Sequence, residues 1–305
     1  MTKWRLLGLA VALGLVSMAA SADTVNVLWY TGGVTSGNVL SYDGAVANMA
    51  TDSVAAGQNT WNVTFWDSGA MPTGTFNVLV VTSPEGGWGT NPDYSALDSA
   101  VTGGLSFDPA TQRVMLTGQD ADWHFQNGPG PTPFDGPQGF LVDSINWAAS
   151  GSGLGLVALG QTGVNGCDEG GASLGVSGFT NSGTDCGTDN VVIPGGVAAN
   201  PVNTGLTSAG LSNWSSSAHV GFTDLSSAWT GINIDGNDLT DSTCSTATPD
   251  SSCDFVTILS SSSAGGGITP GGPPTTTPEP SSLLLLGSGL AGLLFFVEKR
   301  KLARD

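Results

Sequence analysis

The chain is poor in positive charge. Seven of its 305 residues are Lys or Arg, and six of them lie in the first five or last seven positions, which leaves Arg113 as the one such cation between residues 23 and 259. The same stretch contains 22 of the 25 Asp and Glu residues. Nucleic acids and anionic lipid surfaces are bound through Lys and Arg, which neutralise phosphate. The composition therefore excludes nucleic-acid binding and favours divalent cations or basic partners.

Cysteine and histidine are also scarce, with four Cys and two His. The cysteines lie as neighbouring pairs in loops rich in Gly, Ser, Thr and Asp: Cys167 with Cys186, and Cys244 with Cys253. No pair has C-x-x-C spacing and both histidines are distant in sequence, which disfavours a zinc site on these cysteines. We expect disulfides, which restrict the unfolded chain. Three connectivities are open from sequence alone.

The N-terminus has the pattern of a secretory signal peptide. Lys3 and Arg5 precede an apolar run over residues 6–16, and Ala20-Ser21-Ala22 offers small residues for signal peptidase. An N-terminal membrane anchor is the alternative, but a membrane span needs about 20 apolar residues, and this run is shorter. We therefore expect residues 1–22 to be removed on export.

The C-terminus combines a linker, a short apolar segment and a basic end. Residues 260–277 are rich in Ser, Gly, Pro and Thr and cannot bury enough apolar surface to fold. Pro278-Glu279-Pro280 follows, then an apolar segment over residues 283–297, then Lys299-Arg300-Lys301. This order predicts a short transmembrane helix held by cytoplasmic positive charge. A permanent tail anchor is the alternative, although the segment is short and contains three glycines.

These three parts, in this order and behind a signal peptide, resemble the PEP-CTERM sorting domain that exosortases recognise. The resemblance covers residues 278–305 and implies a Gram-negative bacterium in which an exosortase cleaves near Pro278-Glu279-Pro280. It implies transient inner-membrane anchoring and delivery to the cell surface or extracellular matrix, commonly in bacteria that make exopolysaccharide. It implies nothing about the activity of the exported domain, residues 23–259.

The exported domain is expected to be a layered α/β fold with a mostly parallel sheet. Hydrophobic residues make up 39% of the chain and nine residues are Trp, which is too much apolar surface for a disordered chain. Strand-like and helix-like stretches alternate up to residue 160. We expect strands over 25–30, 61–66, 76–81, 112–117 and 155–160, and helices over 43–56, 94–101 and 139–149.

The Gly- and Ser-rich remainder of the domain contains shorter strand-like pieces, which we place at the edge of the sheet: 191–193, 219–222, 231–234 and 255–259. An all-β sandwich is the alternative fold. The order of elements loosely resembles the flavodoxin-like layout of class I glutamine-amidotransferase-like domains. Those enzymes carry a nucleophilic Cys after a strand, where this chain has Gly118-Gln119-Asp120.

Candidate ligand or metal-binding residues follow the ends of two predicted strands. Asp120, Asp122 and His124 alternate after the strand ending at Thr117, so in an extended conformation they share one side. Glu85 follows another strand end. Ligands bind at the carboxyl ends of strands in α/β sheets. The alternative is an Asp-rich turn whose carboxylates accept hydrogen bonds from backbone N–H groups. The metal is left unassigned; Ca²⁺ is a candidate, although the twelve-residue Ca²⁺ loop is absent.

Two functions remain open for the exported domain. The leading hypothesis is a non-enzymatic surface or matrix protein of a biofilm that associates with exopolysaccharide or Ca²⁺. The alternative is a secreted, glycosidase-like hydrolase that uses the strand-end carboxylates. No residue is assigned as catalytic, and His219 is interpreted as a polar residue that enters a strand rather than as a base.

Overall fold

The computed structural model describes most of the exported domain. The described residues are 23–34, 42–84, 92–127, 136–160, 174–182, 189–212, 214, 217–237, 244, 249–250 and 253–261. The chain divides into two compact units, residues 1–265 and 266–305, and every described residue belongs to the first. The signal peptide, the sorting segment, Glu85, Cys167 and Cys186 lie outside the described residues.

Five parallel strands form one half of the sheet. Their order is β2 (Thr60–Trp66), β1 (Thr24–Tyr30), β3 (Val78–Val81), β5 (Gly155–Leu159) and β4 (Val114–Thr117). The last three are buried along their whole length, as expected of central strands that are covered on both faces. The predicted α/β fold with a mostly parallel core is confirmed, and the all-β sandwich is wrong.

Antiparallel strands continue the sheet beyond β4. They are β10 (Phe255–Ser260), β8 (Gly221–Thr223), β6 (Thr180–Ser182), β9 (Trp229–Asp235) and β7 (Val191–Val192). β10 pairs with β9 over most of its length, while β4 and β8 pair with its last and first residues respectively. β4 and β8 therefore meet end to end along the other side of β10. Cys244 and Cys253 form a disulfide just before β10.

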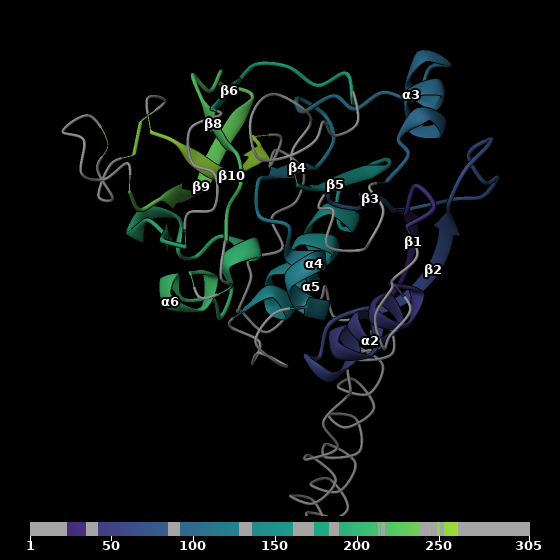
Figure 1. The fold of residues 1–305 in the computed structure, drawn as a ribbon, viewed down its shortest axis with the longest axis horizontal. Helices are drawn as coiled ribbons and strands as arrows, with labels where there is room; N and C mark the ends of the chain where they lie inside the picture. The colour runs from purple at the N-terminus through teal and green to yellow at the C-terminus, as the bar shows by residue number, and fades with distance from the viewer. Residues whose placement is uncertain are drawn as a thin grey trace, which may run out of the picture. The chain divides into compact units, whose positions relative to one another are not determined.

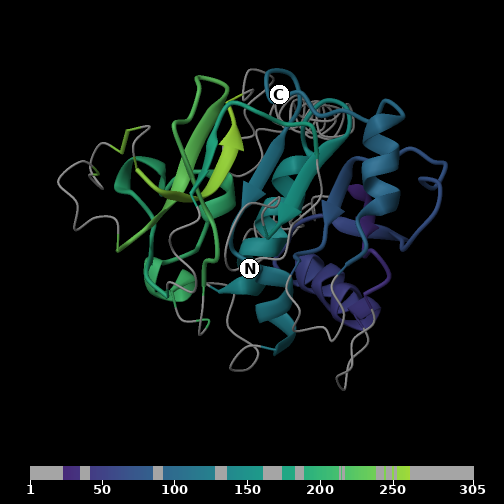
Figure 2. The same ribbon diagram turned by 45° about the horizontal axis from the view of Figure 1, so that its top comes forward.

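Helices cover both faces of the sheet (Figures 1 and 2). The helices are α2 (Tyr42–Ala55), α3 (Ser95–Thr102), α4 (Ala121–Asn127), α5 (Pro137–Ala149) and α6 (Ser208–Leu211), with 3₁₀ turns at Gly195–Val197 and Pro201–Asn203. α2 and α5 pack on the face that presents Val27 and Trp29 of β1. α3 packs on the face that presents Leu28 and Tyr30. The result is a three-layer arrangement with one core on each side of the sheet.

Arg113, the one Lys or Arg of residues 23–259, is used inside the fold. Its side chain is buried, its Nη1 donates to the carbonyl of Trp147 at 2.8 Å and to Ser150 Oγ, and its guanidinium lies over the Trp147 ring. These acceptors lie at the C-terminal end of α5, where a cation also suits the helix dipole. Burial lowers the pKa of Arg113. No lysine or other arginine is therefore left to offset the acidic surface of the described domain.

Asp143 on α5 predicts a pH-dependent stability. Burial raises the pKa of its carboxyl to about 7, although Gln58 Nε2 donates to Oδ1 at 2.6 Å. In the unfolded chain the pKa is about 4, so the folded state binds the proton more tightly and stability falls as pH rises from about 4 to about 7. Between pH 5 and 8, the unfolding free energy of the wild type is expected to fall by about 2–3 kcal/mol more than that of Asp143→Asn.

Urea unfolding at several pH values checks this expectation, because the midpoint of each curve reports the stability at that pH. Asp52 on α2, whose pKa is also raised by burial, is present in both proteins, so its contribution cancels from the comparison. Parallel pH profiles of the wild type and Asp143→Asn would show that the Asp143 carboxyl is ionised in the folded protein throughout this range.

Candidate functional site

The turn between β4 and α4 forms the centre of the candidate site. The extended conformation expected for residues 120–124 is wrong, because α4 begins at Ala121. The backbone N–H groups of Trp123 and His124 donate to the Asp120 carbonyl at 3.0 and 3.1 Å. Residues four apart on a helix lie on one face. Asp120 and His124 therefore stay together, while Asp122 points elsewhere.

Asp122 connects this turn to the end of a neighbouring strand. Its side chain is fully buried, and Oδ2 accepts a hydrogen bond of 3.1 Å from the backbone N–H of Ser83, which follows β3. The sequence offered the alternative that such carboxylates accept hydrogen bonds from backbone N–H groups. Asp122 does so, with a donor that lies 39 residues earlier in the chain.

His219 reaches the site from the segment that precedes β8. Its backbone N–H donates to the carbonyl of Gly118 at 2.9 Å, beside the end of β4. A Cβ atom at Gly118 would lie 2.7 Å from the carbonyl carbon of Val220 and closer still to its oxygen. Gly118 thus permits the close approach of the two backbones. The sequence led us to interpret His219 as a polar residue that enters a strand, and it did not predict that His219 lies beside Asp120.

Asp120 lies between the two imidazoles. Its Oδ1 is 3.1 Å from His124 Nε2 and 3.2 Å from His219 Nε2, and the two rings are 6.4 Å apart. The Asp120 and His124 side chains are about 2% and 1% exposed, and that of His219 is 12% exposed. Burial disfavours ionisation of Asp120, but the two imidazoles outweigh it and lower the pKa of the carboxyl.

The contacts of Asp120 are short without being well-directed hydrogen bonds. Among the described residues, neither of its carboxylate oxygens has a hydrogen-bond partner of good geometry. The ligand atoms of Asp120, His124 and His219 nevertheless lie within 4.8 Å of one another. The three side chains therefore have the spacing needed to hold a metal ion, and we refer to them as the Asp–His–His cluster.

Aromatic rings surround His124 and limit its movement. The imidazole packs edge-on against Trp123, with ring centres 4.8 Å apart, and lies 5.5 Å from the Trp214 ring. Trp214 is fixed in turn by Phe140 of α5 and by a hydrogen bond of 2.7 Å from its Nε1 to the Gly210 carbonyl. A buried imidazole held in this way keeps one orientation.

A buried polar network holds the turn between β4 and α4 in place. Thr117 Oγ1 lies 2.9 Å from Thr257 Oγ1 across the β4–β10 pair, and Thr257 Oγ1 donates to Gln119 Oε1 at 3.1 Å. The Gln119 backbone N–H donates to Thr117 Oγ1 at 3.0 Å. Because these bonds tie Gln119 to both strands, they also fix the direction in which Asp120 leaves β4.

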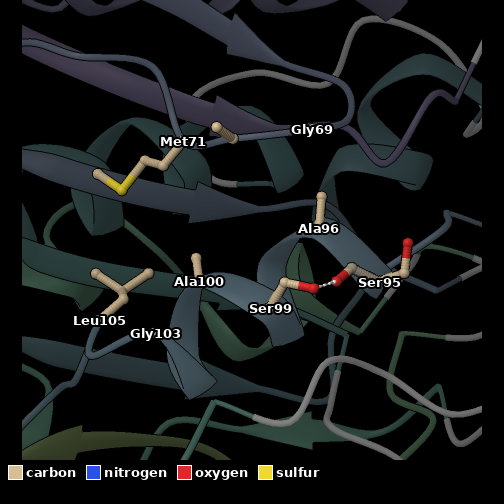
Figure 3. A pocket seen from close by; sticks show the side chains of 9 residues that line it. Gly69, Met71, Ser95, Ala96, Ser99, Ala100, Gly103 and Leu105 are labelled. Atoms are coloured by element: carbon tan, nitrogen blue, oxygen red, sulfur yellow. Dashed lines mark hydrogen bonds between the residues drawn. The ribbon is translucent and has the colours of Figure 1, made fainter.

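A hollow of about 700 Å³ lies beside α3 (Figure 3). It is lined by Gly69, Ala70, Met71, Ser95, Ala96, Ser99, Ala100, Gly103 and Leu105. Ser99 Oγ donates to the Ser95 carbonyl at 2.7 Å. No lining residue is acidic or basic, and both histidines of the chain lie in the Asp–His–His cluster. The serines of this hollow therefore lack the imidazole base that a serine hydrolase requires.

Comparison with known protein families finds a match at the C-terminal end of the chain. Residues 276–301, which contain Pro278-Glu279-Pro280, match the family model of the PEP-CTERM protein-sorting motif. No curated protein and no solved structure matches the chain. The predicted sorting domain is confirmed, and the loose likeness to amidotransferase-like domains gains no support. Within the part of the chain that the structure describes, no helix has both the length and the apolar character needed to cross a membrane.

Proposed function

We propose that the domain of residues 23–259 is a non-enzymatic matrix protein that associates with exopolysaccharide, starting from the premise that the chain is a PEP-CTERM protein. Such a protein is exported, held transiently in the membrane and released to the cell surface, with an exosortase as its processing partner. The domain is then the part that acts outside the cell, after signal peptidase and exosortase have removed the two ends.

The burial of the strand-end carboxylates carries this proposal. A glycosidase needs two carboxyl groups that face an open cleft, one on each side of the scissile bond. Asp122 is fully buried and accepts a hydrogen bond from Ser83, and Asp120 is buried between two imidazoles. Neither carboxylate faces solvent, where a polysaccharide chain would bind. Glu85, the third strand-end carboxylate, lies outside the described residues, and the geometry of the two that are described favours a binding or structural role over hydrolysis.

The surface of the domain suits a hydrated matrix. Val54 is the one large hydrophobic side chain that is exposed among the described residues. So few exposed apolar side chains give the described surface little tendency to aggregate. The excess of acidic residues attracts divalent cations, which can bridge the domain to an anionic polysaccharide. We therefore expect the association to depend on Ca²⁺ where the polysaccharide is acidic.

Co-sedimentation with the exopolysaccharide of the producing bacterium tests the proposal. Where the polysaccharide is acidic, the released protein is expected to sediment with it in Ca²⁺ and to remain in solution in EDTA. An unrelated acidic protein of similar size serves as the control. A reducing-end assay on the same mixtures is expected to match that of the heat-denatured protein. Release of reducing ends by the native protein would establish the hydrolase instead, and absence of sedimentation in Ca²⁺ would contradict the association.

A further inference from the structure

We propose that Asp120, His124 and His219 bind one divalent transition-metal ion, of which Zn²⁺ is the best fit. The ion ties the turn between β4 and α4 to the segment that precedes β8. This inference rests on the geometry of the Asp–His–His cluster and does not depend on the polysaccharide association.

The convergence of both histidines is the first argument. The chain has two His among 305 residues, at positions far apart in sequence, yet their rings are 6.4 Å apart and both present Nε2 to one carboxylate oxygen. One histidine comes from a helix face and the other from a loop before an antiparallel strand. Apolar side chains would fill this part of the core equally well, so we infer that the two imidazoles are paired in order to bind a ligand.

The two Nε2–Oδ1 distances fit the edges of a coordination polyhedron, and all three ligand atoms lie within 4.8 Å of one another. Zn–N and Zn–O bonds are about 2.0–2.2 Å, so two ligands of a tetrahedral ion are about 3.3 Å apart. The two measured Nε2–Oδ1 distances are 3.1 and 3.2 Å. The Asp120 oxygens have no well-directed hydrogen bond among the described residues. Because the Asp120 oxygens accept no well-directed hydrogen bond from a described residue although two ring nitrogens lie close to Oδ1, these oxygens are available to ligate an ion.

The charge balance of the site is the third argument. A buried carboxylate is costly unless a cation accompanies it. No Lys is present in residues 23–259, and Arg113 donates to Trp147 and Ser150 at the end of α5. Apart from the two imidazoles, no charged group of residues 23–259 is therefore placed to offset Asp120, and a bound divalent cation would add positive charge to this carboxylate.

The donor set selects the class of metal. Two imidazole nitrogens with one carboxylate oxygen suit Zn²⁺ and its neighbours in the transition series. Ca²⁺, the candidate raised by the acidic sequence, takes six to eight oxygen ligands and is a poor match for two imidazoles. Three protein ligands leave a fourth position for a solvent ligand. The His219 side chain is 12% exposed, so solvent and the metal reach the site on its side.

Metal binding is expected to stabilise the fold, because the ligands come from segments that are distant in sequence. At a hundredfold excess of free Zn²⁺ over its dissociation constant, the melting temperature is expected to rise by about 5–10 °C. Elemental analysis of the full chain, expressed without a histidine tag, stripped with EDTA and then dialysed against ZnCl₂, is expected to find one Zn²⁺ per chain.

Three variants locate the site. His219→Gln and Asp120→Asn are each expected to weaken Zn²⁺ affinity by about a hundredfold or more and to abolish the rise in melting temperature. Asp143→Asn changes a buried carboxylate that lies outside the cluster and is expected to bind Zn²⁺ as the wild type does. A folded wild-type protein that retains no Zn²⁺, or a His219→Gln protein that binds it with unchanged affinity, would overturn the proposal.

X-ray absorption of the Zn²⁺-loaded wild type identifies the ligands of the ion, and it does so even if the variants fail to fold. The expected spectrum shows scattering from two imidazole rings, which can come only from His124 and His219 because the chain has no other histidine. A spectrum with oxygen ligands alone would contradict the proposal and place any bound Zn²⁺ on surface carboxylates. Sulfur scattering would contradict it as well.

Discussion

Replacing Gly118 with alanine is expected to destabilise the domain by about 3 kcal/mol or more and to lower its melting temperature by at least about 6 °C. The added Cβ atom would lie 2.7 Å from the carbonyl carbon of Val220, and the obstacle is backbone, which cannot move aside as a flexible side chain does. The segment that carries His219 would be pushed from β4. Zn²⁺ affinity is therefore expected to fall together with stability, and thermal melts with and without ZnCl₂ measure both.

Gly195→Ala is the matched control for this substitution. Gly195 lies in a 3₁₀ turn, and a Cβ atom there meets nothing within 4 Å. Its effect on stability is expected to stay within about 0.5 kcal/mol. If Gly118→Ala melts at the temperature of Gly195→Ala, then the close approach of Val220 to Gly118 is not a feature of the folded protein.

Replacing Pro278-Glu279-Pro280 with three alanines is expected to keep the protein in the membrane. The triplet lies within the stretch that matches the sorting motif, just before the apolar segment and the basic cluster Lys299-Arg300-Lys301. Without exosortase recognition, that segment stays in the bilayer, held by its cytoplasmic positive charge. In immunoblots of membrane and culture-medium fractions, the wild-type protein is expected mostly in the medium and the variant mostly in the membrane.

Pro273-Pro274→Ala-Ala provides the control, because these prolines lie in the linker and outside the matched residues 276–301. This variant is expected to be released as efficiently as the wild type. Equal release of both variants would mean that processing does not use the Pro-Glu-Pro triplet. Retention of both would instead point to a general requirement for an extended linker.

The central strands of the fold could be predicted from sequence because their amino-acid composition reflects their burial. Residues 78–81 and 114–117 are nearly continuous apolar runs, which a strand buried on both faces requires. α5 could be predicted for a similar reason, since its apolar residues recur at helical spacing. In these segments the local pattern and the tertiary environment agree.

α4 could not be predicted in the same way. Its seven residues, Ala121–Asn127, are short and mostly polar, and they show no apolar stripe that distinguishes a helix from a turn. Its helical form depends on neighbours that are distant in sequence, among them Ser83, which donates to Asp122. The alternation of Asp120, Asp122 and His124 therefore suggested an extended strand, and only the structure separates Asp122 from the other two.

His219 could not be placed because its position depends on strand pairing. It meets Asp120 because β4 and β8 share one side of β10, and no local pattern encodes that register. The scarcity of histidine was the one available signal, since two histidines in a chain of 305 residues are few enough to ask whether they act together. The sorting segment, by contrast, could be predicted in full, because its three parts follow one another directly in the sequence.

The intact mass of the protein recovered from the culture medium tests the central claim most directly. Export through an exosortase predicts a mature chain whose C-terminus lies near Pro278-Glu279-Pro280 and which lacks the apolar segment of residues 283–297. A released protein that still ends at Asp305 would contradict the account, because the sorting segment would then have left the cell without being cleaved.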